Sequence, residues 1–265
     1  MGYLEHNRQA WNRQSAEGSR WTTPVDSAAV GRAREGDPEL YLTPTRVVPR
    51  AWLGSLSEKD VLCLASGGGQ QAPLLAAAGA RVVSFDLSEE QLAKDRRVAE
   101  REGLSLRCVQ GDMADLSELG DAEFDLVFNP VSNVFVPDLR PVWRECYRVL
   151  RPGGALVAGF MNPSFFLFDH EKGNAAGVLV AKHQLPYSEL DLHRVDPERR
   201  REIEGGEAME FGHSLEAQMG GQLDAGFIIV GLYEDWWDDD ATPLNRLSPT
   251  SMATRAIRLP SAPGR

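Results

Sequence analysis

The sequence has no long hydrophobic run. Nowhere in its 265 residues do apolar side chains approach the ~18 in succession that a membrane-spanning helix requires. The N-terminal residues also lack an apolar segment followed by a cleavage pattern, which would mark a secretory signal peptide. We therefore expect a cytoplasmic protein with no membrane partner.

Cysteine is scarce. The chain has three, Cys63, Cys108 and Cys146, with no Cys-x-x-Cys spacing, and the odd number argues against a disulfide framework. Cys63 and Cys108 lie in apolar runs, where cysteine usually packs as a small hydrophobic side chain. The charged string around His170 also lacks the ligand spacing of a metal motif. The sequence therefore predicts no bound metal.

Positive charge is scarce as well. The chain has 28 Lys and Arg residues against 39 Asp and Glu residues, which gives a formal net charge of −11. Because a chain this acidic is repelled by phosphate backbones, nucleic acid is not an expected partner. We expect a small-molecule substrate, and a protein that acts as a monomer or a homodimer.

Short apolar runs alternate with helical segments through the middle of the chain. The runs predict buried strands at residues 61–65, 81–85, 105–109, 124–128 and 155–160. Later in the chain, a helix and two more strands are expected at residues 214–223, 227–233 and 254–259. Strands that alternate with helices at this spacing are typical of a doubly wound α/β fold, a parallel sheet with helices on both faces.

Other segments fall outside this alternation. Residues 1–50 are polar with isolated aromatic side chains, and we expect them to form an N-terminal flap or lid on a main domain at residues 51–265. Residues 163–213 are rich in His, Gly and charged side chains and are interpreted as an insertion after the fifth strand. Trp236 and Trp237, followed by three aspartates, are interpreted as packing and solubility residues, with a dimer contact as the alternative.

Three glycines end the first predicted strand. Gly67, Gly68 and Gly69 allow the main chain to turn sharply and to approach a ligand closely, because glycine has no Cβ atom. The helix that follows offers free N–H groups and the positive end of its dipole. The string Gly-x-Gly-x-x-Ala at residues 67–72 fits a nicotinamide-dinucleotide fingerprint, another nucleotide loop, or a turn without a ligand.

Carboxylates end the next two strands. Asp86 lies 19 residues after Gly67, where a nucleotide-binding α/β domain places the acid that accepts from ribose hydroxyls. The alternative is that Asp86 caps the next helix, but Ser88 and Gln91 already predict a capping box there. Asp112 can accept from an adenine amino group, or it is a plain turn aspartate.

The glycine loop, the two acids and the Arg-Pro-Gly-Gly turn at residues 151–154 together resemble the class I S-adenosylmethionine-dependent methyltransferases, of the small-molecule, methyltransferase-domain 11-like type. The resemblance covers residues 60–160 and continues more loosely through residues 227–259. It implies a Rossmann-like, mostly parallel seven-stranded sheet with an antiparallel last strand. It also implies that S-adenosylmethionine is the cofactor and S-adenosylhomocysteine the product.

The resemblance gives each strand end a role. In that family the first loop holds the methionine end of the cofactor, the acid after the second strand holds the ribose, and the Gly-Asp after the third strand contacts adenine. The segment after the fourth strand lies beneath the sulfonium. The cofactor-binding residues implied in this sequence are Ala65, Ser66, Gly67, Gly68, Gly69, Asp86, Leu87, Asp112, Met113, Asn129, Pro130 and Val131.

The first strand departs from the family pattern. Cys63 and Ala65 stand where the family usually has an acid and the first glycine. A thiol in an apolar strand does not carry a negative charge cheaply. We therefore expect the methionine ammonium group to be held by the Ala65 carbonyl, the Ser66 hydroxyl or a group from residues 1–50.

The implied reaction is an in-line displacement at the methyl carbon, which requires alignment of the acceptor and exclusion of water. A general base is needed only if the acceptor still holds a proton at the transition state. His170, His183 and His213 are candidates for this base, and each is also interpreted as an ordinary surface or hydrogen-bonding histidine. The expected acceptor-binding residues are Trp11, Trp21, Ser132, Asn133 and Phe166, and the two tryptophans would equally serve as anchors for the flap.

Two other functions are compatible with parts of the sequence. An NAD-dependent oxidoreductase fits the glycine string and Asp86, but it does not predict Gly111-Asp112-Met113 or the turn at residues 151–154. A catalytically silent nucleoside-binding module fits the altered first loop. The sequence also leaves open whether oxygen, nitrogen, sulfur or carbon is methylated.

Overall fold

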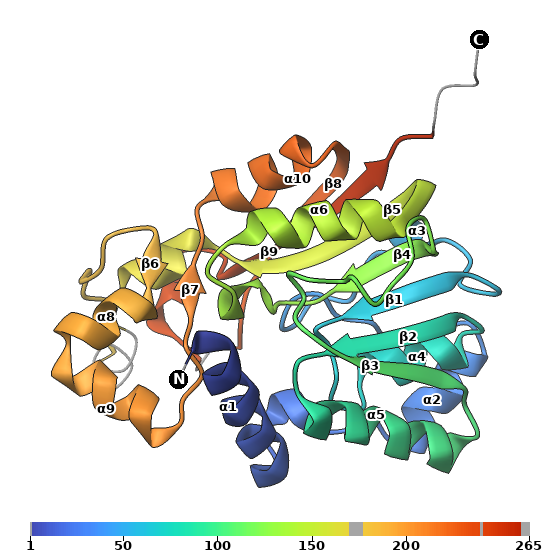
Figure 1. Cartoon of the computed structure of the whole chain (residues 1–265), viewed down its shortest axis with the longest axis horizontal. Helices are drawn as coiled ribbons and strands as arrows, with labels where there is room; N and C mark the ends of the chain where they lie inside the picture. Colours follow the sequence, from blue (N-terminus) through green and yellow to red (C-terminus); the bar gives the residue numbers. More distant parts are fainter. Residues whose placement is uncertain (1, 170–176, 239–240, 261–265) are drawn as a thin grey trace.

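The computed structural model describes residues 2–169, 177–238 and 241–260, and its centre is a seven-stranded sheet (Figure 1). The strands lie in the order β3-β2-β1-β4-β5-β9-β8. Their bounds are β1 (Asp60–Leu64), β2 (Arg81–Asp86), β3 (Leu106–Gln110), β4 (Phe124–Asn129), β5 (Leu150–Met161), β8 (Phe227–Asp235) and β9 (Ser251–Arg258). The strands from β1 to β5 pair in parallel, whereas β9 runs antiparallel to both of its neighbours. The predicted mostly parallel sheet with an antiparallel last strand is confirmed.

Alternate residues of the strands point into two separate cores. On β1, Cys63 belongs to the core that includes α2 (Ser27–Arg34) and α4 (Gln71–Ala77), whereas Leu62 belongs to the core that includes α6 (Leu139–Val149). Successive side chains of a strand point to opposite faces, so a strand covered on both sides is apolar throughout. The other helices of this part are α3 (Arg50–Leu53), α5 (Glu89–Glu102), the π-helix η4 (Glu216–Gly220) and α10 (Gly221–Asp224). The sheet is therefore doubly wound, as predicted.

The helix after β2 begins at the predicted residue. Ser88 Oγ accepts a hydrogen bond from the Gln91 N–H at 3.2 Å, and Gly103 ends α5 in the left-handed region with a φ of 64°. The reciprocal bond of a capping box is absent, because the Gln91 Oε1 atom has no hydrogen-bond partner among the described residues. Only half of the predicted capping box is formed, which leaves the Gln91 side chain available for another contact.

The predicted turn at residues 151–154 lies inside β5 and not before it. β5 pairs with β4 at Leu150 and then again from Ala155, so the residues between them are skipped in the register. Gly153 has a positive φ of 87°, which favours glycine, and α6 ends at Val149 directly before the strand. The segment is a bulge that brings the chain from the helix into the sheet without a loop, so the strand begins earlier than predicted.

The described residues in the range 163–213 form a separate set of short elements. They are η3 (Pro163–Leu167), β6 (Tyr187–Ser188), α8 (Glu189–Val195), α9 (Pro197–Gly205) and β7 (Phe211–Gly212). The antiparallel pair of β6 and β7 forms a ribbon apart from the main sheet. These elements lie beyond the carboxyl ends of the parallel strands (Figure 1). They therefore stand over the edge where open α/β sheets bind their ligands.

The N-terminal residues lie against the same edge. They form α1 (Tyr3–Glu17), η1 (Arg20–Thr22) and α2, and α1 lies between α5 and the ribbon of β6 and β7 (Figure 1). The Lys94 Nζ atom on α5 donates to the carbonyl oxygens of Ser15 and Thr22 at 2.7 Å and 2.6 Å. Among the described residues, no helix is both long and apolar enough to cross a membrane.

Candidate functional site

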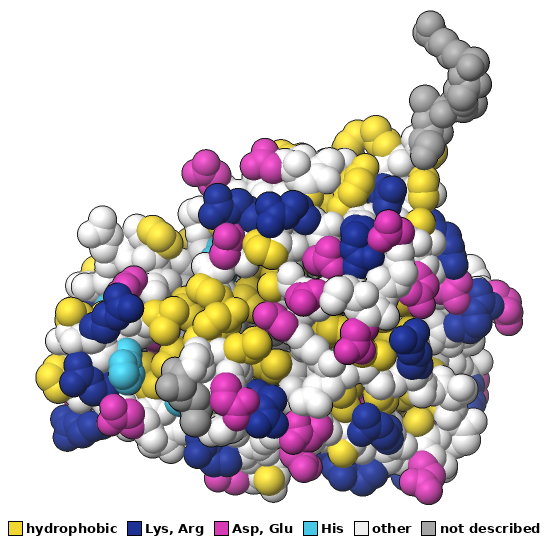
Figure 2. Space-filling view, viewed as in Figure 1, with side chains coloured by type: hydrophobic (Ala, Val, Ile, Leu, Met, Phe, Trp, Pro, Cys, Tyr) yellow, Lys and Arg dark blue, Asp and Glu magenta, His cyan; other side chains and the backbone are white. Residues whose placement is uncertain are grey.

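A cavity of about 560 Å³ lies at the carboxyl ends of the parallel strands. Its walls come from three parts of the chain: the strand ends of the sheet with the segments after them, the N-terminal residues, and a later group made of Met161, Phe165, Phe166, Glu210 and Trp237. The volume is typical of sites that enclose small molecules and cofactors. Hydrophobic side chains also gather on this face of the molecule, between the α8 and α9 part and the sheet (Figure 2).

The three glycines of the first loop face different partners. Gly67 lines the cavity, and an added Cβ atom there would lie 2.7 Å from Gln91 Cβ. Gly68 and Gly69 are outside the lining and pack against the N-terminal segment, where a Cβ atom on Gly69 would lie 2.8 Å from Pro24 Cβ. The Val25 N–H donates to the Gly69 carbonyl oxygen at 2.8 Å. One glycine therefore borders the cavity, and the next two allow residues 21–25 to approach the loop closely.

Asp86 joins the glycine loop to the start of α5. Its Oδ2 accepts from the Gly67 N–H at 2.9 Å and its Oδ1 accepts from the Ser88 N–H at 2.8 Å. Burial raises the pKa of Asp86 to about 6, although the two N–H donors lower it. Asp86 lines the cavity, and a carboxylate has about four acceptor positions, so it can still accept from hydroxyl groups of a ligand.

Asp112 and Met113 follow β3 on the same side of the cavity. Asp112 Oδ1 accepts from the Ala114 N–H at 3.0 Å, and burial raises the pKa of its carboxyl. Met113 is buried, and both Met113 and Leu87 line the cavity. The ends of β2 and β3 therefore present two carboxylates and an apolar thioether to the same space.

A further carboxylate, Asp95 on α5, holds the loop from behind. Its side chain is fully buried, with Oδ1 accepting from the Gly69 N–H at 2.6 Å and Oδ2 from the Ser84 hydroxyl at 2.6 Å. Burial raises the pKa of Asp95 to about 7. Our sequence prediction missed this residue. The available signal was an acid on the face of α5 that also carries Leu92 and Val98, where an apolar residue is expected.

The residues that replace the family pattern are neutral. Cys63 is fully buried, its Sγ lies 2.6 Å from Ser66 Oγ, and burial raises the pKa of its thiol. Ala65 lines the cavity and has a φ of 47°, in the left-handed region that favours glycine. Gln91 also lines the cavity, and its unpartnered Oε1 is a buried acceptor close to Gly68. The loop thus offers neutral acceptors where the family usually has an acid.

The segment after β4 forms the next wall. Pro130, Val131 and Ser132 line the cavity. Asn129 and Asn133 are fully buried and outside the lining. Asn129 Nδ2 donates to the Leu64 carbonyl at 3.1 Å and to Ser132 Oγ at 2.9 Å, and Asn133 Nδ2 donates to Gln218 Oε1 at 3.1 Å. The two asparagines therefore hold the wall in place from behind.

Aromatic side chains from distant segments contact one another around the cavity. Trp11 lies edge-on to Phe135 with ring centroids 5.0 Å apart, and Trp21 lies 5.8 Å from Trp237. Phe166 stacks on Tyr187 at 5.3 Å. All of these except Tyr187 line the cavity. Trp237 was interpreted from the sequence as a packing residue, so its place in the cavity wall was missed.

Neither of the two described candidate histidines, His183 and His213, lines the cavity. His170 lies outside the described residues, and His183 lies edge-on to Tyr187 at 5.1 Å, away from the lining. His213 is buried, with its Nε2 atom 2.9 Å from the Val136 carbonyl oxygen. The acid that lines this side is Glu210, which the sequence analysis did not select. Within the described ranges, no three His, Cys, Asp or Glu side chains form a cluster that would hold a metal ion.

Comparison with known proteins gives consistent matches. Residues 62–158 match the family described as "Methyltransferase domain". The chain is 46% identical over 259 residues to the uncharacterized methyltransferase YbaJ of Bacillus subtilis (strain 168), covering 97% of this chain and 98% of that protein. The matched family region contains the glycine loop, both strand-end acids and the wall after β4.

Solved structures share the fold. Geranyl diphosphate C-methyltransferase from Streptomyces coelicolor A3(2) is similar with a TM-score of 0.61 and 15% identity, over 98% of this chain and 99% of that one. A 1,6-didemethyltoxoflavin-N1-methyltransferase from Burkholderia thailandensis is similar with a TM-score of 0.57 and 17% identity, over 97% of this chain and 89% of that one. At these identities the likeness concerns the fold alone.

Proposed function

The chain belongs to the class I S-adenosylmethionine-dependent methyltransferases, and we propose that it transfers the methyl group of this cofactor to a small-molecule acceptor bound in the same cavity. The observation that carries the proposal is that Gly67, Asp86 and Asp112, from three successive strand ends, line one cavity with a wall of aromatic side chains. Polar groups at one end and apolar rings at the other suit a nucleoside beside an apolar acceptor.

The residues present fit S-adenosylmethionine. Asp86, already fixed by two main-chain donors, would accept from the ribose hydroxyls. Asp112 would accept from the adenine amino group, and the main chain and side chain of Met113 would contact the ring. The acceptors for the methionine ammonium would be the Ala65 carbonyl, the Ser66 hydroxyl and the unpartnered Gln91 Oε1 atom. This set replaces the missing acid with neutral oxygens.

The proposed mechanism is mainly one of positioning. When bound, S-adenosylmethionine supplies an electrophilic methyl carbon next to a sulfonium leaving group. Pro130, Val131 and Ser132 would hold the acceptor in line with that carbon, because this wall is fixed from behind by Asn129 and Asn133. The apolar rings would keep water out of the reaction space, which prevents hydrolysis and strengthens polar contacts.

The cover over the cavity supports a small acceptor. We propose that residues 1–50 act as a lid on the main domain at residues 51–265, with the insertion at about residues 163–213 forming the opposite wall. Residues 20–25 pack on the glycine loop, and Trp11 contacts Phe135, so the N-terminal segment would close the space around a ligand. Two proteins of the same fold are named as methyltransferases of small molecules, geranyl diphosphate and 1,6-didemethyltoxoflavin. Their names support the same class of acceptor.

Calorimetry with three cofactors tests the proposal. S-adenosylmethionine and S-adenosylhomocysteine should bind with a stoichiometry of one per chain, and NADH should not bind. Tight binding of NADH alone would favour the oxidoreductase alternative, and binding of neither sulfur compound at millimolar concentration would contradict the proposal. A crystal grown with S-adenosylhomocysteine would then define the space beside its sulfur atom that an acceptor must fill.

A further inference from the structure

Among the charged residues that line the cavity, Glu210 differs from the others in its side-chain interactions. The others are Arg20, Arg32, Glu39, Asp86 and Asp112, and each has a side-chain hydrogen bond or ion pair. In the described part of the chain, the Glu210 carboxylate has neither, although the residue is partly buried. A carboxylate left without a partner in an enclosed space is costly, and a ligand that donates to it removes that cost.

The main chain on both sides of this carboxylate is firmly held. The Glu210 N–H donates to Glu189 Oε2 at 2.8 Å, and the Glu210 carbonyl accepts from the Glu189 N–H at 3.2 Å. The preceding residue, Met209, exchanges two hydrogen bonds with the buried Asn7 side chain, at 2.7 Å and 3.0 Å. The residue that carries the free carboxylate is therefore fixed in position, as a binding site requires.

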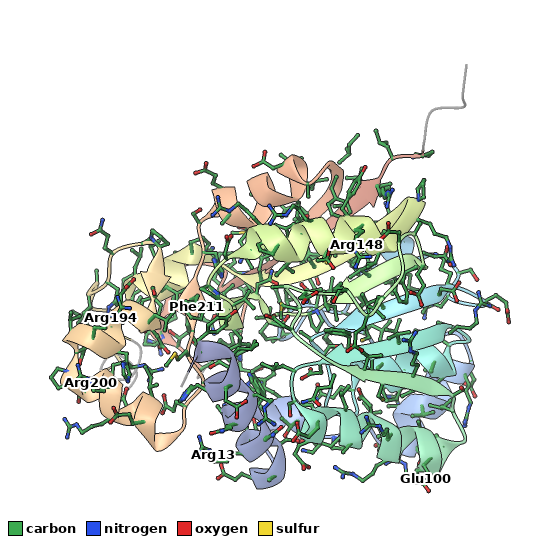
Figure 3. The ribbon with its side chains drawn as sticks, viewed as in Figure 1. Arg13, Glu100, Arg148, Arg194, Arg200 and Phe211 are labelled. Carbon is green, nitrogen blue, oxygen red and sulfur yellow. The ribbon has the colours of Figure 1, made fainter. Side chains whose placement is uncertain are left out.

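The surroundings place Glu210 at the aromatic end of the cavity. Asn7 Nδ2 also donates to the Phe135 carbonyl at 3.1 Å, which ties Met209 to the wall that carries the Trp11 and Phe135 rings. Phe211, the first residue of β7, lies beside the N-terminal end of α1 (Figure 3), with its ring centroid 6.0 Å from that of Tyr3. Glu210 is thus held between α1, the wall after β4 and β7.

We propose that the Glu210 carboxylate binds the acceptor through an N–H or O–H group on its nucleophilic atom and takes up that proton during methyl transfer. This inference rests on the proposed function. In the balanced step, the nucleophilic atom bonds to the methyl carbon, the carbon–sulfur bond breaks with its electron pair remaining on sulfur, and the proton passes to a Glu210 carboxylate oxygen. The acceptor class is a small apolar or aromatic molecule with a weakly acidic N–H or O–H group.

The electrostatic surroundings suit this role. Burial raises the pKa of Glu210 to about 7, with a further increase from Glu189 and Glu207 and a decrease from Arg199. On α1, which packs on the same strand, His6 contacts the Glu207 carbonyl and Tyr3 contacts Phe211. A general base is most effective when its pKa lies near the working pH. Above a pH of about 7 the carboxylate is ionised and accepts; below it the acid is neutral.

The test uses two probes of nearly equal shape, 4-methylphenol and its methyl ether 4-methylanisole. Their affinities are measured by calorimetry on the full chain saturated with S-adenosylhomocysteine, for the wild type, Glu210→Leu, Glu210→Gln and the control Glu204→Gln, an exposed acid on α9. We expect the wild type and the control to bind 4-methylphenol roughly tenfold more tightly than 4-methylanisole. Glu210→Leu should remove this preference without changing S-adenosylhomocysteine affinity.

The pH dependence provides a second readout that a purely structural role would not give. For the wild type, 4-methylphenol affinity should rise as the pH increases from about 6 to about 8, because the Glu210 carboxyl ionises over that range while the phenol does not. Glu210→Gln should show a flat profile. Its unfolding temperature should be no lower than that of the wild type, because the variant removes an unpartnered buried charge.

Three outcomes overturn the assignment of Glu210: equal affinity of the two probes for the wild type, a preference that persists in Glu210→Leu, or binding of neither probe while S-adenosylhomocysteine still binds. If the wild type did not bind S-adenosylhomocysteine, that result would instead contradict the proposed function itself. The two failures are therefore distinguishable.

Discussion

The two ends of the cavity are built in different ways. The end formed by β1, β2 and β3 uses main-chain groups and acids at successive strand ends, such as Asp86 bonded to the Gly67 N–H 19 residues earlier. The aromatic end uses side chains from segments far apart in the chain, such as Asn7 bonded to Met209 across 202 residues. We call the end with Gly67, Asp86 and Asp112 the strand-end half. The end with Trp11, Phe135 and Glu210, held by Asn7, is the aromatic half.

The difference indicates which half can change without loss of the fold. The sheet alone determines the position of the strand-end half, because the carboxyl ends of parallel strands lie at one edge. The aromatic half depends on how α1 and residues 163–213 pack over that edge. If the proposed function is right, sequence changes in the aromatic half would therefore alter the acceptor while leaving the cofactor contacts intact.

The largest effect is expected from Gly67→Val in the strand-end half. A Cβ atom at this position would lie 2.7 Å from Gln91 Cβ and 3.2 Å from Asp86 Oδ2, so a valine would displace two residues that line the cavity. S-adenosylhomocysteine affinity should fall about a hundredfold, or by ~2.7 kcal/mol, in calorimetry. Gly205→Val, where a Cβ atom meets nothing within 4 Å, is the control and should bind normally. Wild-type affinity in Gly67→Val would show that this glycine does not border the cofactor.

Asp86→Ala should have the next largest effect. The variant loses the acceptor proposed for the ribose hydroxyls and also releases the Gly67 N–H. We expect cofactor affinity to fall by at least about tenfold, as for other hydrogen bonds to charged groups. Asp115→Ala, an exposed acid in the loop after β3, serves as the control. An unchanged affinity would remove Asp86 from the ribose contact.

Asn7→Ala tests the aromatic half. The substitution removes three hydrogen bonds, to Phe135 and Met209, and leaves a buried N–H without a partner. The free energy of unfolding should fall by about 1–3 kcal/mol. Hydrogen exchange should become faster at residues 207–212, while S-adenosylhomocysteine affinity changes by less than about threefold.

The exposed Gln9→Ala variant on the same helix controls for changes to α1. If Asn7→Ala weakened the cofactor as strongly as Asp86→Ala, the two halves would not be independent, and the comparison drawn above would be wrong.

The smallest effect is expected from Ala65→Gly. Ala65 has a φ of 47°, and glycine relieves the strain of a left-handed alanine while it increases the entropy of the unfolded chain. The net gain in the free energy of unfolding should be at most about 1 kcal/mol, measured by urea unfolding. Ala122→Gly, at a φ of 51° away from the cavity, should show a similar gain. A destabilised Ala65→Gly would contradict this account of the loop.

The strand-end half was largely accessible from the sequence. Its strands, the start of α5 and the two acids follow from local patterns of apolar residues, glycines and caps. What the local pattern could not give was the direction in which each group faces. Gly68 and Gly69 look equivalent to Gly67 in the sequence, yet they contact residues 21–25.

The aromatic half was predicted less completely for a physical reason. Trp237 and Glu210 acquire their places only through contacts with segments that are distant in the chain, and no periodicity or motif around them signals a cavity. The role of Asp95 could be predicted in part. An acid on the buried face of an amphipathic helix is itself a local signal that a partner exists.

The bond between Asn7 and Met209 also has a consequence for biosynthesis. Asn7 on α1 is synthesised before Met209, the partner that fixes it, which follows 202 residues later. Until then the helix has no Met209 to hold it, and closing so long a loop is a late and slow event in folding. The strand-end half precedes Met209 in the order of synthesis. A chain interrupted before Met209 would therefore contain the strand-end half but lack the partner that fixes α1 in the aromatic half.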